Sequence, residues 1–408
     1  ATGSFDITGI GTVTWRDGDN ILAFGHPMMA LGDVDVPMTS AWVLDFVPSI
    51  SRSNKLASGM ETVGAVVRDG NWAIGGTVGR QAPTVPATVI VTDEDRGLTR
   101  EFSFEVARQK LLTGGLLMSL VGGSMEAVFS PGGPGIGAID FTLRGDKGVE
   151  ITRRDVLIPD SYFMGVTSWV GEAIQVMVNN RYQPQNVAEL QVRVGLTGVD
   201  RSAAVERIYT EENVARAGKP LHVHVVLRPE GGEPIEKVVV LPMPDNLPKG
   251  RIRVGAGAGA DEWSLKSRLR LMMPQIDSLD DIAQVIRTMK RADQLFVAAS
   301  LPEITLAVQG TELPHLPGSV AESLITAART DMDAGYTELS ETLETDLVLY
   351  GYQTIRIPTE DRQGNRGKVT GTAPGDESED GMASGAVGDT GLEKLWWAAP
   401  ALERMAAP

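Results

Sequence analysis

The sequence predicts a mainly β protein with an α+β part towards its C-terminus. Three observations predict this class: short β-prone runs between glycine and proline turns near the N-terminus, longer alternating runs in the middle, and a switch to helical spacing after residue 260. The 408 residues allow two to four domains. Hydrophobic residues make up 42% and charged residues 22%, so we expect most of the chain to fold.

Residues 1–145 are expected to form a first β domain. Gly11–Trp15 and Ile21–Phe24 are β-prone, and Asp17-Gly18 between them is a hairpin signal. Three further runs have similar spacing and favour a small barrel or sandwich over a parallel sheet: Val63–Val67, Trp72–Val78 and Ala87–Val91. A stripe of leucines over residues 103–121 predicts the first helix.

Residues 146–262 are expected to form an accessory β-sandwich of the immunoglobulin-like kind. From Glu189 to Leu196 apolar and polar residues alternate, as a strand with one solvated face requires. The run Gly255–Ala260 fits a dinucleotide-binding fingerprint loosely. Because the preceding strands read as antiparallel, we interpret this run as a flexible linker.

Residues 263–358 are expected to be an α+β accessory domain, with a second helix from Pro317. Ser278 followed by Asp281 is an N-cap pattern before residues with helical spacing. Its strand-like segments are Leu295–Ala299, Ile304–Val308 and Leu347–Ile357. Residues 359–408 are expected to be a disordered acidic tail with a short terminal helix. Trp396-Trp397 in that helix either docks on a partner or a membrane surface, or is incidental.

Charge and composition exclude several classes of function. Against 37 basic residues stand 53 acidic ones, a net charge of −16, so nucleic acid is not an expected partner. The absence of cysteine excludes disulfides, thiolate nucleophiles and cysteine-bound metals. No apolar run is long enough to span a bilayer, and no cofactor is expected. The pattern does not predict the oligomeric state.

One histidine is placed as a catalytic base would be. His26 directly follows a predicted strand and lies between Gly25 and Pro27, whose small and rigid backbones would hold the imidazole in one place. An imidazole side chain ordinarily titrates near neutral pH, which suits a general base. The alternative is a turn histidine with a purely structural role.

The residues around His26 resemble the SpoIVB peptidase family, serine peptidases of which long exported bacterial members exist. The resemblance is carried by Gly25-His-Pro27, Leu31-Gly32, Val36-Pro-Met-Thr39, Val47-Pro-Ser49, Lys55-Leu56, Gly64 and Gly75–Gly79, and more loosely by Phe104–Ala107, Leu111–Thr113, Leu227–Pro229, Ser278–Asp280 and Glu312–Pro317. It implies a chymotrypsin-like β-barrel portion, a protein or peptide substrate or an envelope protein as partner, and export to the periplasm or the extracellular space.

Of the family's catalytic triad only His26 carries over. The family's nucleophile lies in a Gly-Met-Ser-Gly-Ser/Thr-Pro motif that is absent from this chain, and Ser124 is its nearest imitation. In long members the serine motif precedes the histidine, so the chain, which starts at Ala1, is expected to be a C-terminal portion with an incomplete first domain.

The triad acid is not identified by the sequence. Asp33 and Asp35 lie close to His26 in sequence, and Asp69 lies on a nearby turn, but none matches a family motif. Where the family has an acid before a Leu-Leu pair, this chain reads Ala107–Leu112 without one. A non-catalytic envelope scaffold or binding protein that retains the peptidase fold is therefore the alternative function. A carbohydrate- or envelope-binding β protein is a weaker alternative.

Two further histidines form the only other motif of note. His222 and His224 are two apart on a predicted strand, so both project to one face. Such a pair could share a metal ion, but it equally fits an ordinary solvated strand face. We expect no metal site.

Overall fold

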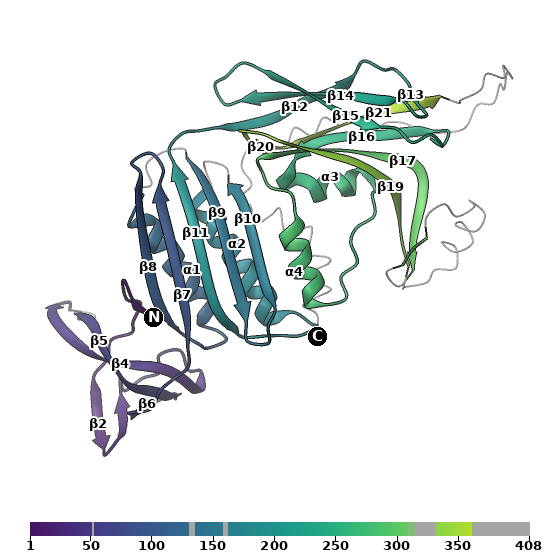
Figure 1. Cartoon of the computed structure of the whole chain (residues 1–408). Coiled ribbons are helices and arrows are strands. Elements are labelled where there is room, and N and C mark those ends of the chain that lie inside the picture. Colours follow the sequence, from purple (N-terminus) through teal and green to yellow (C-terminus); the bar gives the residue numbers. More distant parts are fainter. Residues whose placement is uncertain (51–52, 130–134, 158–161, 309–310, 314–331, 361–408) are drawn as a thin grey trace.

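A computed structural model describes residues 1–50, 53–129, 135–157, 162–308, 311–313 and 332–360. It confirms the mainly β class, with four sheets that follow one another along the molecule (Figure 1). The helices pack on the central sheet and against the inner sheet of the C-terminal unit. Within the described residues, no helix is both long and apolar enough to cross a membrane.

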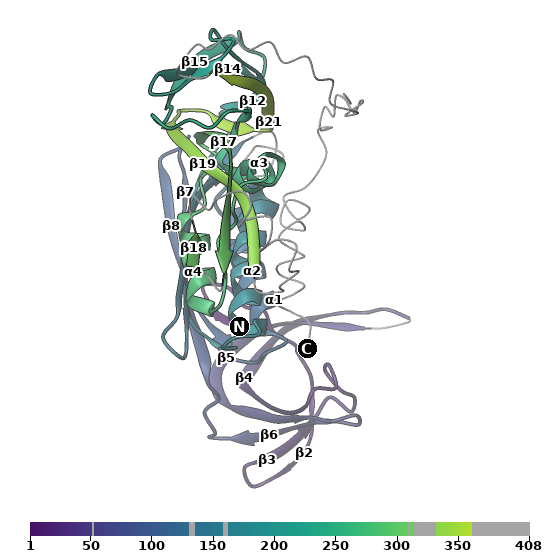
Figure 2. The same cartoon turned by 90° about the vertical axis from the view of Figure 1, so that its right-hand side faces the viewer.

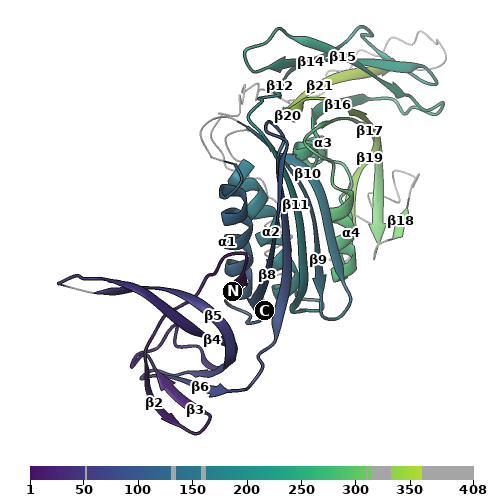
Figure 3. The same ribbon diagram turned by 60° about the vertical axis from the view of Figure 1, so that its left-hand side comes forward.

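The N-terminal sheet is antiparallel and open, with β2 and β4 at its edges. In spatial order its strands are β2 Val13–Asp17, β3 Asn20–Ala23, β6 Ile74–Val78, β5 Asn54–Asp69 and β4 Gly32–Val47. The hairpin expected at Asp17-Gly18 is confirmed, since Asp17 pairs with Asn20 and Gly18 has a φ of 55°. The long β4–β5 hairpin curves away from the rest of the molecule (Figures 2 and 3).

The central unit is a six-stranded mixed sheet covered by two helices on one face (Figure 1). In spatial order its strands are β1 Thr2–Gly3, β8 Leu98–Ala107, β7 Thr84–Asp93, β11 Val187–Thr197, β9 Ile136–Gly145 and β10 Glu150–Leu157. The helices are α1 Thr113–Glu126 and α2 Tyr162–Asn179. They bury the apolar face of the sheet in the largest hydrophobic core of the described chain.

This sheet corrects two expectations. It runs across the boundary expected between residues 145 and 146, because β11 pairs with β7 in parallel and with β9 in antiparallel. The helix expected over 103–121 begins only at Thr113, because Phe102, Phe104 and Val106 alternate and lie buried on strand β8.

The C-terminal unit consists of two sheets that share one core. The outer sheet, in spatial order, has β15 Ile235–Pro242, β14 Pro220–Pro229, β12 Ser202–Thr210 and β20 Val348–Tyr350. The inner sheet has β13 Ala215–Arg216, β21 Tyr352–Glu360, β16 Arg251–Ala258, β17 Gln294–Val308 and β18 Thr311–Leu313, with β19 Met332–Glu344 also on β17. A 3-10 turn, Gly259–Asp261, leads into helix α3 Glu262–Leu269, and helix α4 Leu279–Thr288 follows.

The expected linker at Gly255–Ala260 was wrong. Its first residues lie in β16, a buried strand between β17 and β21. Ala256 and Ala258 face the shared core, while Gly257 lies so close to Tyr352 that a Cβ added there would meet the Tyr352 Cβ at 2.6 Å. The small residues therefore permit close packing between strands rather than flexibility.

The N-cap expected at Ser278 is confirmed. Its side chain accepts a hydrogen bond from the backbone N–H of Asp281 at the start of α4, and the Asp281 carboxylate accepts one from the Ser278 hydroxyl. The helix expected from Pro317 and the tail with Trp396-Trp397 lie outside the described residues.

Replacing Gly257 by alanine should destabilise the protein by about 1–3 kcal/mol, because the methyl group overlaps the Tyr352 Cβ on the neighbouring strand. Gly115→Ala is the matched control, since its added Cβ meets nothing within 4 Å and lies on α1. That control should stabilise by about 0.5–1 kcal/mol. Urea unfolding of both variants measures the difference, and equal effects would contradict the packing argument.

Candidate functional site

His26 lies on an exposed turn between β3 and β4. Its Nδ1 is 2.7 Å from the Pro27 carbonyl oxygen, and its ring is 5.7 Å from that of Phe24, centroid to centroid. When Nδ1 carries the proton and donates to this carbonyl, Nε2 keeps its lone pair, which is the form a general base requires.

The backbone of this turn is held in uncommon conformations. Phe24 and Ala30 have φ values of 76° and 57°, and Gly25 and Gly32 are also in the left-handed region. Non-glycine residues with positive φ carry steric strain and often occur at functional sites. The strain indicates that surrounding contacts fix the path of the chain around His26.

Those contacts come from Asp69, which lies at the end of β5. Its carboxylate accepts hydrogen bonds from the backbone N–H groups of Met28, Met29 and Leu31, at 2.7, 2.7 and 3.3 Å. The side chain is buried, and burial by itself raises the pKa of a carboxyl group. The backbone hydrogen bonds outweigh this effect and hold the pKa of Asp69 below its usual range. Asp69 is therefore an ionised anchor for the segment after His26.

None of the three candidate acids orients the imidazole. Asp33 pairs with Arg68 at 2.7 Å, Asp35 pairs with Arg80 at 2.9 Å, and Asp69 binds the turn backbone. Across the described ranges, no carboxylate forms an ion pair with His26. Asp69 thus lies at the histidine turn, as the sequence suggested. Its carboxylate binds backbone N–H groups of the turn and not the imidazole ring of His26.

Ser124 lies in a different unit from His26. It is fully buried on α1, where its Oγ donates a hydrogen bond to the Leu120 carbonyl at 2.7 Å. A hydroxyl sealed inside the central core and bound to its own helix is not accessible to a substrate. The structure therefore gives no support to Ser124 as a nucleophile.

His222 and His224 share one face of β14, as the spacing predicted. The His222 Nδ1 lies 2.7 Å from a Glu212 oxygen, and the His224 Nδ1 lies 2.5 Å from a Glu236 oxygen. Tyr209 stacks on the His224 ring at 4.7 Å and donates its hydroxyl to Glu236. Each histidine has its own glutamate, and the described part of the chain holds no group of three residues suited to a metal ion.

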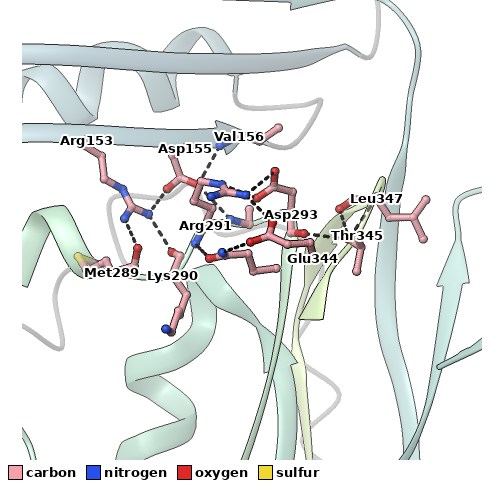
Figure 4. Close-up of polar contacts among 12 residues, drawn as sticks. Arg153, Asp155, Val156, Met289, Lys290, Arg291, Asp293, Glu344, Thr345 and Leu347 are labelled. Atoms are coloured by element: carbon pink, nitrogen blue, oxygen red, sulfur yellow. Dashed lines mark hydrogen bonds and ion pairs between the residues drawn. The ribbon is translucent and has the colours of Figure 1, made fainter. Parts of the chain in front are cut away.

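A buried polar junction joins the central sheet to the C-terminal unit (Figure 4). Arg153 on β10 donates to the carbonyl oxygens of Met289 and Lys290, just after α4, and to the Asp155 carboxylate. Asp155 also accepts from the backbone N–H of Ala292. The Arg153 guanidinium lies over the Trp169 ring at 4.9 Å. Both charged side chains are nearly inaccessible to solvent.

The same junction continues on the strands of the C-terminal unit. Arg291 pairs with Asp293 at 2.8 Å and with Glu344 on β19 at 2.5 Å (Figure 4). Every charged side chain of the junction has an oppositely charged partner within it, so we interpret the junction as structural. The sequence analysis missed it, although Arg153 and Asp155 follow Ile151 at two-residue spacing on one strand face, a signal of buried charge.

One acid stands apart from these pairs. Burial raises the pKa of Glu172 on α2 to about 7, and the described residues offer its carboxyl no hydrogen bond or ion pair. A carboxylic acid that titrates near neutrality has a property useful for acid–base chemistry. Burial is the sole cause of this shift, and no charged group contributes to it, so we assign no site to Glu172.

Comparisons with known proteins leave the family open. No family model, no curated protein and no solved structure matches this chain. The candidate site is therefore defined by the His26 turn and its Asp69 anchor alone.

Asp69→Asn should lower the free energy of unfolding by about 1–3 kcal/mol at pH 7, because one amide oxygen replaces a carboxylate that accepts three backbone N–H groups. Since the pKa of Asp69 is depressed, its contribution is present above the ordinary value of 3.8 and is lost as the pH falls below it. Denaturation at pH 7 and pH 3 tests this, with the exposed Asp19→Asn as control. A difference between variant and wild type that is unchanged at pH 3 would argue against the anchor.

Arg153→Met should destabilise the protein by about 3–5 kcal/mol, because it leaves the buried Asp155 charge and the carbonyls after α4 without their donor. Arg154→Met is the control, since Arg154 is its exposed neighbour on the same strand. Thermal and denaturant unfolding report both variants. Similar losses for the two would show that the junction is not the cause.

Proposed function

We propose that this chain is the histidine-bearing, C-terminal portion of an exported SpoIVB-type serine peptidase-like protein. His26 is the general base, and the serine comes from a polypeptide segment outside this sequence. The substrate is a protein or peptide, and the compartment is the periplasm or the extracellular space. By itself the chain is catalytically silent, because an imidazole without a nucleophile cannot form an acyl-enzyme.

The observation that carries this proposal is the geometry of the His26 turn. The ring is exposed, Nδ1 faces the Pro27 carbonyl, and a strained turn is tied down by the ionised Asp69. A general base needs an accessible lone pair in a fixed position. An ordinary surface histidine needs neither the strained backbone nor the buried carboxylate beneath it.

A non-catalytic scaffold or binding protein is the second candidate. It is favoured by the assignment of Asp33, Asp35 and Asp69 to partners other than His26. A serine triad requires a carboxylate that orients the imidazole. In this alternative the histidine turn is a structural element, and the C-terminal sheets or the exposed N-terminal sheet bind a partner.

A fluorophosphonate probe separates these functions. The 408-residue chain should not label, and the longest natural form of the protein should label on a serine outside this sequence. His26→Ala in that form should abolish labelling, because it removes the base, whereas His222→Ala should leave it unchanged. Labelling is read by gel fluorescence, and the labelled residue by mass spectrometry.

Each other outcome has a definite meaning. Labelling of the 408-residue chain that is lost in Ser124→Ala would overturn the proposal in favour of a nucleophile within the chain. A longest form that does not label, or that labels equally without His26, would reject the peptidase function and favour the scaffold.

A further inference from the structure

The second half of β4 combines two features that soluble proteins rarely leave uncovered. We define the β4 edge as residues Ala41–Val47. This run pairs with β5 on one side only, so its other side has backbone N–H and C=O groups without a partner strand. The Phe46 N–H is the exception to an unpaired backbone here, since it donates to the Asp45 carboxylate at 2.8 Å. Trp42, Leu44 and Phe46 along it are 65%, 66% and 61% exposed.

The apolar exposure is concentrated in this sheet. Of the 22 exposed large hydrophobic residues in the described chain, 14 lie between residues 13 and 72, although that segment is a small part of the molecule. Within the N-terminal sheet, only Ile21, Ala23, Ala65 and Ile74 are buried apolar residues. A sheet with so small a core needs a further surface to cover it.

The backbone of the edge decides what kind of surface covers it. A lipid surface would accept the apolar side chains, but hydrocarbon offers no partner to unpaired backbone N–H and C=O groups. Another β-strand satisfies both the backbone and the side chains. The partner is therefore a polypeptide in extended conformation.

We propose that this partner is the β4 edge of a second copy of the chain, and that the two copies pair antiparallel about a two-fold axis. An edge strand is complementary to itself when paired in this way, so no other sequence is required. The inference does not use the chemistry of His26. The segment outside this sequence that the proposed function requires is the competing occupant of the β4 edge, and a 408-residue chain that stays monomeric would favour it.

Charge favours a second copy at this place. The whole chain carries a net charge of −16, which keeps copies apart over most of the surface. The outer part of the β4–β5 hairpin, residues 36–66, is neutral and holds two acidic and two basic residues, Asp45, Glu61, Arg52 and Lys55. The base of the hairpin carries the further acids Asp33, Asp35 and Asp69 against Arg68. The hairpin also projects away from the central sheet, so two copies can meet there (Figure 3).

The available area is of the size that a dimer needs. Trp42, Leu44 and Phe46 together expose on the order of 400 Å². That is about half of the roughly 800 Å² that one partner contributes to a standard interface. Val43, Val47 and the strand backbone add to the same surface.

The sequence of β4 limits the residues at which the two-fold axis of the dimer can lie. Pro37 has no N–H, and register shifts between Met38 and Ala41 interrupt the first half of β4. An axis at Asp45 would place two carboxylates opposite each other, which is unfavourable. An axis at Val43 places Asp45 opposite Ala41 and Trp42 opposite Leu44. The β4–β5 pairing has one further register shift in this run, at Leu44, and the new pair of strands would extend across it. We therefore expect the axis at Val43.

Single cysteines test the register, because the chain contains none of its own. Directly opposed residues of antiparallel strands have Cα atoms about 4.5–5.5 Å apart, within the span of a disulfide. Val43→Cys should form a covalent dimer under air with a copper catalyst at least about tenfold faster than Val199→Cys, an exposed residue in the loop between β11 and β12. A scan over Ala41–Val47 in which no position exceeds that control would overturn the proposal.

Sedimentation equilibrium tests the association itself. The wild-type chain should approach twice its mass of 43.6 kDa as its concentration rises. Phe46→Lys should weaken the dimer about tenfold or more, because in each copy a charged ammonium replaces an apolar ring of the interface and must be desolvated there. Trp72→Lys is the matched control, an exposed aromatic residue on the loop before β6, and should leave the dimer unchanged.

Three outcomes would reject the second copy. If the chain stays monomeric, the β4 edge binds a different polypeptide. If the chain forms a dimer that Phe46→Lys does not weaken, the dimer interface is at another surface. Binding of a monomeric wild-type chain to phosphatidylcholine vesicles, lost in Phe46→Lys, would assign the edge to a lipid surface.

Discussion

The arginine–carboxylate pair between Arg153 and Asp155 holds the two larger units of this protein together. Both side chains are buried where β10 meets the segment after α4. The two terminal guanidinium nitrogens of Arg153 donate to backbone carbonyls of that segment, and Asp155 accepts from one of its N–H groups, whereas the Arg153 Nε has no hydrogen-bond partner among the described residues. Buried charge is tolerated only when it is paired in this way. The pair therefore fixes the position of α4 against the central sheet and, through Arg291 and Glu344, the start of β17 and the end of β19.

The N-terminal sheet is stabilised by a different principle. It has few buried apolar side chains, and hydrogen bonds hold the turn that carries His26. There a single buried carboxylate, Asp69, orders the backbone from Met28 to Leu31. A local network of charge-assisted hydrogen bonds thus maintains a strained turn on a sheet whose outer strand remains available to a partner.

These contrasts bear on function. The central unit has the largest core, the two C-terminal sheets share a second core, and the N-terminal sheet is open. The histidine turn and the β4 edge both belong to this open sheet at one end of the molecule (Figure 1). The peptidase proposal uses the histidine turn, and the proposed self-association uses the β4 edge. The two features belong to one sheet but rest on different residues.

Local patterns in the sequence were sufficient for the mainly β class, the hairpin at Asp17-Gly18 and the N-cap at Ser278, because each depends on the conformational preferences of adjacent residues. Tertiary structure decided the rest. Gly257 lies in a buried strand because a strand distant in sequence packs against it. Strand β11 pairs with β7 across the domain boundary expected at residue 145, because strand pairing is non-local. The role of Asp69 followed the same rule: the sequence placed it near His26, and only the fold determined that its carboxylate binds the backbone instead of the imidazole.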